Sequence, residues 1–190
     1  MEQLKERIRK DGRVIGNDIL KVDSFLNHQI DPALTDAIGA EFYRLFSAEK
    51  VDRVLTIEAS GIAAAVMTAK YFGCPLVFAK KSRTVNQSAS VYTSKAFSFT
   101  HKTESNVTVS KEYIKPGENV LIIDDFLANG CALRALRDIV LQAGANPVGA
   151  GIIIEKAFQP GGKDLRSEGL RIESLARIKS MSEQNGIEFI

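Results

Sequence analysis

The sequence predicts an α/β fold in which helices cover both faces of a parallel β-sheet. Strand-like and helix-like segments alternate from residue 51 to residue 155, which is the pattern of parallel sheets. The chain has 190 residues, of which 45% are hydrophobic and 25% charged. This length and balance are typical of one globular domain with a substantial buried core.

Two helices are expected ahead of the sheet. Leu4 and Ile8 lie four residues apart and predict a short amphipathic helix at the start of the chain. The segment 31–50 predicts a longer helix, because Asp31 can cap it and Pro32 suits its first turn. Its apolar residues fall on one face: Leu34, Ile38, Phe42, Leu45 and Phe46.

The remaining elements follow in alternation. Strands are expected at 51–57, 75–79, 119–126 and 148–155. Helices are expected at 61–72 and at about 130–143, the second with Gly144 at its C-terminal cap. In such a sheet, ligands bind where strands end and helices begin. The loops EASG at 58–61 and DDFLANGCA at 124–132 are therefore the first candidates for a site.

The segment from Lys80 to about Tyr113 differs in composition from the rest. It is rich in Ser, Thr, Asn and Lys and contains short alternating stretches such as SVYTSKAFSF. This pattern predicts a polar β-hairpin with one solvated face. Its length and polarity fit a flexible flap over a site, and they fit a solvated surface ribbon equally well.

Composition excludes several classes of protein. A formal net charge of +2 does not favour binding to nucleic acid or to an anionic membrane. Cys74 and Cys131 lack metal-site spacing, so we expect two reduced thiols. The N-terminus alternates charges without the apolar centre of a signal peptide, and no apolar run approaches the length of a membrane span. We therefore expect a cytoplasmic protein.

The loop DDFLANGCA combines two chemical features. The apolar run VLII is followed by Asp124 and Asp125, whose carboxylates can accept hydrogen bonds from vicinal hydroxyls or help to hold a divalent cation. The mostly small residues that follow can let backbone N–H groups converge on an anion at a helix N-terminus; they are Ala128, Asn129, Gly130, Cys131 and Ala132. Together these features match a sugar phosphate better than an ordinary capped strand–helix junction.

The stretch VLIIDDFLANGCA resembles the motif with which type I phosphoribosyltransferases bind phosphoribosyl pyrophosphate (PRPP). Asn129, where many members carry Thr, further resembles the bacterial xanthine phosphoribosyltransferases, as do ILKVDSFLNHQID and IEKAFQPG. The similarity extends over essentially the whole chain. Cys131 departs from the usual Gly or Gln, at a position that acts mainly through its backbone.

The resemblance implies a fold, a reaction and an assembly. The fold is the type I phosphoribosyltransferase fold, a single domain over 1–190 with a small hood from about 1–30 and 156–190 and a β-hairpin flap. The reaction joins xanthine to PRPP, with Mg²⁺ carried by PRPP, and releases xanthosine 5′-monophosphate and pyrophosphate. The flap would close over PRPP, and the enzyme would be a homodimer.

The EASG turn resembles the pyrophosphate loop of the family. Glu58, Ala59, Ser60 and Gly61 place small residues and backbone N–H groups at the start of a helix, and Ser60 adds a hydroxyl. A simple helix cap by Ser60 explains the motif equally well. Lys80 and Lys81 follow the next strand, and Lys81 is the better candidate to contact the leaving group, although two solvated lysines are the simpler interpretation.

The resemblance also assigns a purine site. Leu20 would supply backbone and packing contacts, Asn27 an amide facing a ring nitrogen, and Lys156 a donor to an exocyclic oxygen. A donor at that position disfavours adenine, which carries an amino group there. Without the resemblance, Asn27 would be interpreted as a turn residue and Lys156 as an exposed lysine at a strand end. Phe158 would stack on the base or belong to the core.

Three alternatives remain open. The enzyme could use hypoxanthine and guanine, or adenine, because no residue in the sequence clearly distinguishes xanthine from guanine. The fold also serves in PRPP-sensing repressors, but only about 50 residues precede the first sheet strand and they lack a basic recognition helix. An RNA-binding regulator on the same fold is the third alternative.

Overall fold

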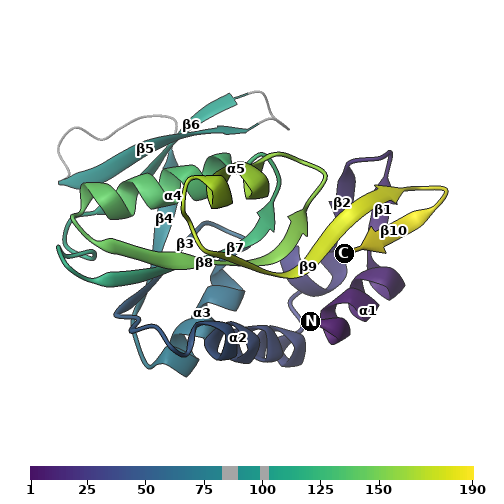
Figure 1. Cartoon of the computed structure of the whole chain (residues 1–190), viewed down its shortest axis with the longest axis horizontal. Helices are drawn as coiled ribbons and strands as arrows, with labels where there is room; N and C mark the ends of the chain where they lie inside the picture. Colours follow the sequence, from purple (N-terminus) through teal and green to yellow (C-terminus); the bar gives the residue numbers. More distant parts are fainter. Residues whose placement is uncertain (83–89, 99–102) are drawn as a thin grey trace.

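The computed structural model describes residues 1–82, 90–98 and 103–190, and its centre is an eight-stranded sheet (Figure 1). In spatial order the strands are β10 (Gly186–Phe189), β9 (Ile172–Ser182), β8 (Asn146–Lys156), β7 (Asn119–Leu127), β3 (Arg53–Ile57), β4 (Leu76–Ser82), β6 (Thr103–Ser110) and β5 (Val91–Ser98). The five strands from β9 to β4 are parallel, and three pairings are antiparallel: β10 with β9, β6 with β4, and β5 with β6. The predicted parallel sheet is confirmed.

Helices cover both faces of the sheet, as predicted (Figure 1). Helix α4 (Cys131–Gln142) packs on one face, and α2 (Pro32–Phe46) and α3 (Ile62–Phe72) pack on the other. Successive residues of the strands point to opposite faces, so the sheet separates two apolar cores. Ile122 of β7 belongs to the core under α4, and Ile123 belongs to the core shared with α2 and α3.

Helix α2 begins as the sequence predicts. The Asp31 carboxylate accepts a hydrogen bond from the backbone N of Leu34 at 3.1 Å, and Pro32 is the first helical residue. The helix ends at Phe46, four residues before the end of the predicted segment. Its expected apolar face is buried except for Leu45, which is partly buried.

The predicted hairpin is present, but part of it is integrated into the core. Strand β4 runs three residues beyond the expected Ala79, because Lys80 and Lys81 pair with Thr108 and Val107 of β6. Ala96, Val107 and Val109 are buried in the core under α4, so the base of the hairpin has an apolar face. Residues 83–89 and 99–102 of the predicted flap lie outside the described residues.

Several elements at the two ends of the chain had no sequence prediction. The N-terminal part contains α1 (Glu2–Asp11), whose existence was expected, followed by the ribbon β1 (Arg13–Ile15) and β2 (Ile19–Lys21) and a π-helical turn (Asp23–Asn27). The C-terminal part contains α5 (Gly161–Ser167), β9 and β10. The described part of the chain contains no helix long and apolar enough to cross a lipid bilayer.

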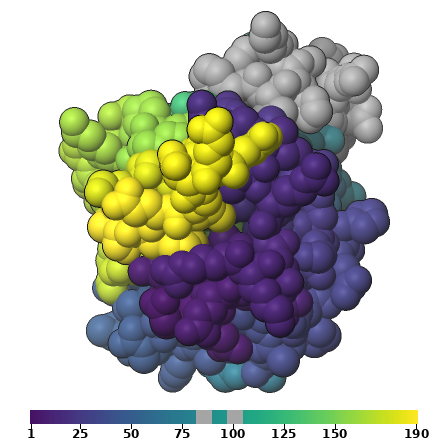
Figure 2. All heavy atoms as spheres, turned by 90° about the vertical axis from the view of Figure 1, so that its right-hand side faces the viewer, coloured from purple at the N-terminus to yellow at the C-terminus, as the bar shows by residue number. Residues whose placement is uncertain are grey.

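The two ends of the chain pack against each other. The N-terminal ammonium of Met1 donates to the Leu175 carbonyl at 2.6 Å, and Lys5 Nζ donates to the Ile190 carbonyl at 3.1 Å. Figure 2 shows the purple N-terminal and yellow C-terminal segments side by side on one face of the molecule. These contacts join the first and last parts of the chain into one unit beside the parallel sheet.

Candidate functional site

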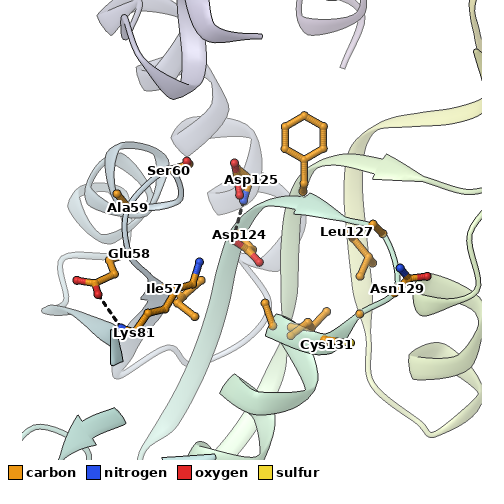
Figure 3. Close-up of a pocket in the computed structure, with 15 residues that line it drawn as sticks. Ile57, Glu58, Ala59, Ser60, Lys81, Asp124, Asp125, Leu127, Asn129 and Cys131 are labelled. Carbon is orange, nitrogen blue, oxygen red and sulfur yellow. Dashed lines mark hydrogen bonds between the residues drawn. The ribbon is translucent and has the colours of Figure 1, made fainter. Parts of the chain in front are cut away.

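A cavity of about 340 Å³ opens where β3 and β7 give way to the loops that follow them (Figure 3). Its walls come from the turn after β3, from β4, and from the end of β7 with the start of α4. This is the edge where parallel α/β sheets bind ligands, because strands end there and helices begin. Both loops selected from the sequence line this one cavity.

Asp124 and Asp125 both line the cavity, but their environments differ. Asp124 is only 4% exposed, whereas Asp125 is half-buried. Burial, reinforced by the neighbouring Asp125 carboxylate, raises the pKa of Asp124 well above its usual range. The backbone N of Asp125 donates to Asp124 Oδ1 at 3.0 Å (Figure 3), which fixes the orientation of that carboxyl group. A protonated Asp124 can donate a hydrogen bond as well as accept one.

The small-residue loop leads directly into helix α4. Gly130 has a φ of +81° and precedes Cys131, the first residue of the helix. No described side chain caps this end of α4. The first N–H groups of a helix have no partners within it, and they carry the positive end of the helix dipole. All five residues of 128–132 line the cavity, so the loop has the geometry of an anion site.

The EASG turn forms the facing wall. Glu58, Ala59 and Ser60 line the cavity, and the peptide bond between Glu58 and Ala59 is cis. Gly61 packs behind them: a Cβ atom there would lie 2.3 Å from Thr56 Oγ1 and 3.4 Å from Asp124 Oδ1. No described side chain caps α3, so the alternative role of Ser60 as a helix cap is not supported.

Lys80 and Lys81 point to different sides of the sheet. Lys81 lines the cavity, and its backbone N donates to Glu58 Oε1 at 2.6 Å (Figure 3). Lys80 instead lines a separate surface pocket beside Phe78 and Tyr113. Because side chains alternate along a strand, the extension of β4 through both residues explains why only Lys81 reaches the site.

Lys156 lies outside the cavity lining and contacts the N-terminal part of the chain. Its Nζ donates to the Asp18 carbonyl at 2.5 Å and lies 5.8 Å from the centre of the Phe126 ring. Burial lowers the pKa of the Lys156 ammonium, partly offset by the Asp18 carboxylate. Phe126 does line the cavity, so Lys156 adjoins the cavity through this ring.

The other predicted purine residues lie on the same N-terminal elements. Leu20 belongs to β2 and is buried, and Asn27 is the last residue of the π-helical turn. The Asn27 Oδ1 atom is buried but accepts no hydrogen bond from any described residue. Such an atom favours a ligand that donates to it, because an unpaired buried acceptor is costly. Phe158 is 42% exposed, so of its two expected roles the one in the core is wrong, and stacking on the base stays a prediction.

Sequence reasoning gave no role to the apolar part of the cavity wall. Ile57 and Leu133 lie outside both candidate loops, and Phe126 and Leu127 lie inside the loop 124–132 but were assigned no contact. Ile57 and Phe126 lie inside predicted strands, where an apolar residue normally signals core. Only their position at the ends of those strands could have indicated a role in the site. The Asp18 carbonyl could not have been found from sequence, because a backbone atom leaves no residue signature.

The cavity can hold a metal ion only if a bound ligand supplies most of the coordinating atoms. Among the described residues, no group of three or more His, Cys, Asp or Glu side chains is placed to hold a metal. Asp124, Asp125 and Glu58 line the cavity and carry the carboxylate oxygens that hard cations prefer.

Comparisons with known proteins agree with this geometry. A family model described as phosphoribosyl transferase domain matches residues 25–168. The xanthine phosphoribosyltransferase of Lachnoclostridium phytofermentans is 54% identical over 98% of this chain and 96% of that protein. That of Clostridioides difficile is 55% identical, over 95% of this chain and 96% of that protein. The crystal structure of adenine phosphoribosyltransferase from Thermoanaerobacter pseudethanolicus has a TM-score of 0.74 at 21% identity, over 92% of this chain and 99% of that one.

Proposed function

Because the chain belongs to the phosphoribosyl transferase domain family, we propose that it transfers the phosphoribosyl group of PRPP to xanthine. The products are xanthosine 5′-monophosphate and pyrophosphate, and the role is purine salvage. The observation that carries this proposal is the meeting of the acidic pair, the small-residue loop and the EASG turn in one cavity. Relatives more than half identical to the chain and named for this reaction support the choice of xanthine.

PRPP would lie across the cavity with its two charged ends on opposite walls. The loop 128–132 binds the 5′-phosphate at the start of α4, and the EASG turn with Lys81 binds the pyrophosphate. Asp124 and Asp125 lie between them and bind the ribose hydroxyls. The neutral form of Asp124, which burial favours, can donate to one hydroxyl oxygen while the other carboxylate accepts.

The reaction breaks the bond between the anomeric carbon and pyrophosphate and forms one to a xanthine ring nitrogen, which loses its proton. Positive charge develops on the ribose as the leaving group departs, so the nearby Asp125 carboxylate stabilises the transition state. Lys81 and the N–H groups of the EASG turn receive the departing anion. Mg²⁺ bound to PRPP would neutralise part of the pyrophosphate charge, and the Asp124–Asp125 pair would help to hold it.

Xanthine would bind between the hood and the end of β8. Lys156 donates to an exocyclic oxygen of the base, Asn27 Oδ1 accepts from a ring N–H, and Leu20 packs against the ring. An amino group in place of that oxygen would face the Lys156 donor with another donor, which disfavours adenine. The hood comprises about 1–30 and 156–190 and forms part of the single domain.

The proposal extends to assembly and location. The β5–β6 hairpin closes over bound PRPP and excludes water, which would hydrolyse the reactive sugar. The protein acts in the cytoplasm as a homodimer. Light scattering of the purified protein tests the dimer directly, and a monomeric mass would contradict it.

The purine site is tested by replacing Lys156 with methionine, which keeps the stem and removes the donor. We expect the KM for xanthine to rise about tenfold or more, with the KM for PRPP changed less than about twofold. Lys179→Met is the matched control, because Lys179 pairs with Glu188 on the exposed edge of the sheet. An unchanged KM for xanthine in K156M would contradict the proposed base contact.

A further inference from the structure

Helix α5 begins in direct contact with the loop 128–130. The backbone N of Gly161 donates to the Ala128 carbonyl at 3.1 Å. A Cβ atom on Gly161 would lie 2.4 Å from that carbonyl oxygen and 2.5 Å from the backbone N of Gly130. Gly161 does not have a positive φ, so its backbone conformation would accept any residue. Glycine is needed at position 161 only because the loop 128–130 occupies the space that a side chain would fill.

The contact is equally close from the side of the loop. A Cβ atom on Gly130 would lie 3.2 Å from Gly161 Cα and 3.0 Å from Leu165 Cδ1 of α5. Gly130 and Gly161 are both buried. The two backbones therefore pack on each other without an intervening side chain, and a shift of α5 must move the loop.

An ion pair with the buried carboxylate of Glu155 fixes α5 to the sheet. Glu155 of β8 is 1% exposed, and its two oxygens accept hydrogen bonds from Arg166 of α5 at 2.7 Å each. Ser174 donates to the same carboxylate at 2.5 Å. A Cβ atom on Gly162 would lie 2.4 Å from Glu155 Oε1, so the helix start fits closely over this pair. A bidentate pair of this kind fixes geometry as well as contributing energy.

We propose that Gly161 and the Glu155–Arg166 pair are positioning residues that set the conformation of loop 128–130 for the 5′-phosphate of PRPP. This inference rests on the proposed function of that loop. A phosphate site requires backbone N–H groups to face the ligand and carbonyl groups to face away. The bond from Gly161 to the Ala128 carbonyl orients that oxygen toward α5 and away from the phosphate.

The arrangement also links the two substrate sites. Glu155 immediately precedes Lys156, and only residues 157–160 separate Lys156 from Gly161. The same short segment thus begins at the proposed base contact and ends on the proposed phosphate loop. None of these positioning residues lines the cavity, so they act through the loop and not on the substrate.

The test is Gly161→Ala in the full chain, with binding of ribose 5-phosphate and of pyrophosphate measured by calorimetry. We expect ribose 5-phosphate affinity to fall about tenfold or more, because an added methyl group must displace the loop. Pyrophosphate affinity should stay within about twofold, because the EASG turn forms a different wall of the cavity from the loop against which Gly161 packs. The KM for PRPP should rise while the KM for xanthine changes little.

Gly169→Ala is the matched control, since Gly169 lies just after α5 with a φ of +89° and no described atom near its Cβ position. It strains the backbone without touching the loop, so it should lower the melting temperature and leave ribose 5-phosphate affinity unchanged. Arg166→Lys is the second test and replaces G161A if that variant fails to fold. It keeps the charge but loses the bidentate geometry, and it should weaken ribose 5-phosphate binding several-fold.

The outcomes separate this inference from the proposed function. If G161A binds ribose 5-phosphate as tightly as wild type, the positioning role alone is overturned. The same holds for R166K when it is used in place of G161A. An equal loss of affinity in G169A would show that general destabilisation is the cause, and would also overturn it. A wild-type protein that binds neither PRPP nor ribose 5-phosphate would overturn the proposed function itself, and this inference with it.

Discussion

At the scale of single residues, Asp124 is the most unusual group in the site. It is a nearly fully buried carboxyl group beside a second carboxylate, and both circumstances disfavour its charge. A protein keeps such a group only if another gain offsets its cost to stability. The proposed contact with the ribose of PRPP supplies that reason.

This burial predicts a pH-dependent effect of Asp124→Asn. The folded pKa of Asp124 lies above its ordinary value of 3.8, so its contribution to stability is complete below that value and is lost as pH rises through the folded pKa. The neutral amide avoids this loss. D124N should therefore unfold at higher denaturant concentration than wild type at pH 7, and the difference should shrink toward pH 4. A difference independent of pH would contradict the assigned burial cost.

The sequence predicted which residues form this site, but it did not predict which carboxyl group is buried. An apolar strand followed by two carboxylates and small residues was sufficient to place Asp124, Asp125 and the loop 128–132 in one cavity. Which carboxyl group is buried depends on the close packing of Gly61, from another turn, against Asp124. Residue patterns along one segment carry no information about such neighbours.

At the scale of elements, the two ends of the parallel strands have different roles. The cavity lies at the C-terminal ends of the strands. An ion pair that stabilises the fold lies at their N-terminal ends. Arg53 at the start of β3 donates to Glu118, just before β7, at 2.9 and 2.6 Å. Both side chains are less than a fifth exposed, so solvent screens this pair less than a surface pair.

Glu118→Gln should accordingly affect stability and not catalysis. We expect the free energy of unfolding to fall by about 1–2 kcal/mol, because a bidentate charged pair is replaced by weaker hydrogen bonds. The values of kcat and KM should stay as in wild type. Glu41→Gln is the matched control: its bidentate partner Arg44 is 68% exposed, so the loss of stability should be much smaller. A large change in KM for either substrate in E118Q would refute this division of the sheet.

Elements were predictable where local pattern and tertiary packing agree. Helix α2 has its cap, its proline and its apolar face in the sequence, and it forms as predicted. Strand β4 was predicted too short, because its last residues are polar and are held by pairing with β6 from a distant segment. Strand β9 and helix α5 were not predicted, and α5 is a short helix fixed by the Glu155–Arg166 pair.

At the scale of the whole molecule, the proposed sites for the two substrates lie on different parts of the chain. The proposed PRPP contacts line the cavity at the ends of the parallel strands, and the proposed base contacts lie on the N-terminal elements and at the end of β8. Lys156 joins these halves through its bond to the Asp18 carbonyl. The proposed reaction requires this arrangement, because the base must approach the ribose from the side opposite the pyrophosphate.

Removal of divalent metal should separate activity from stability. No described cluster of side chains is placed to hold a metal by itself, so the ion is expected to enter with PRPP. EDTA should abolish nucleotide formation, added Mg²⁺ should restore it, and the melting temperature of the free protein should change by less than about 1 °C. A large drop in melting temperature with EDTA would indicate a structural metal instead.

Competition among purine bases tests the central claim most directly. The protein would receive Mg²⁺ and PRPP with equal concentrations of xanthine, guanine, hypoxanthine and adenine, and chromatography would quantify the nucleotides formed. Their initial ratios equal the ratios of kcat/KM, and we predict that xanthosine 5′-monophosphate dominates, with adenine the poorest substrate. Predominance of another nucleotide would contradict the assignment to xanthine, and no nucleotide from any base would contradict the proposed transferase activity.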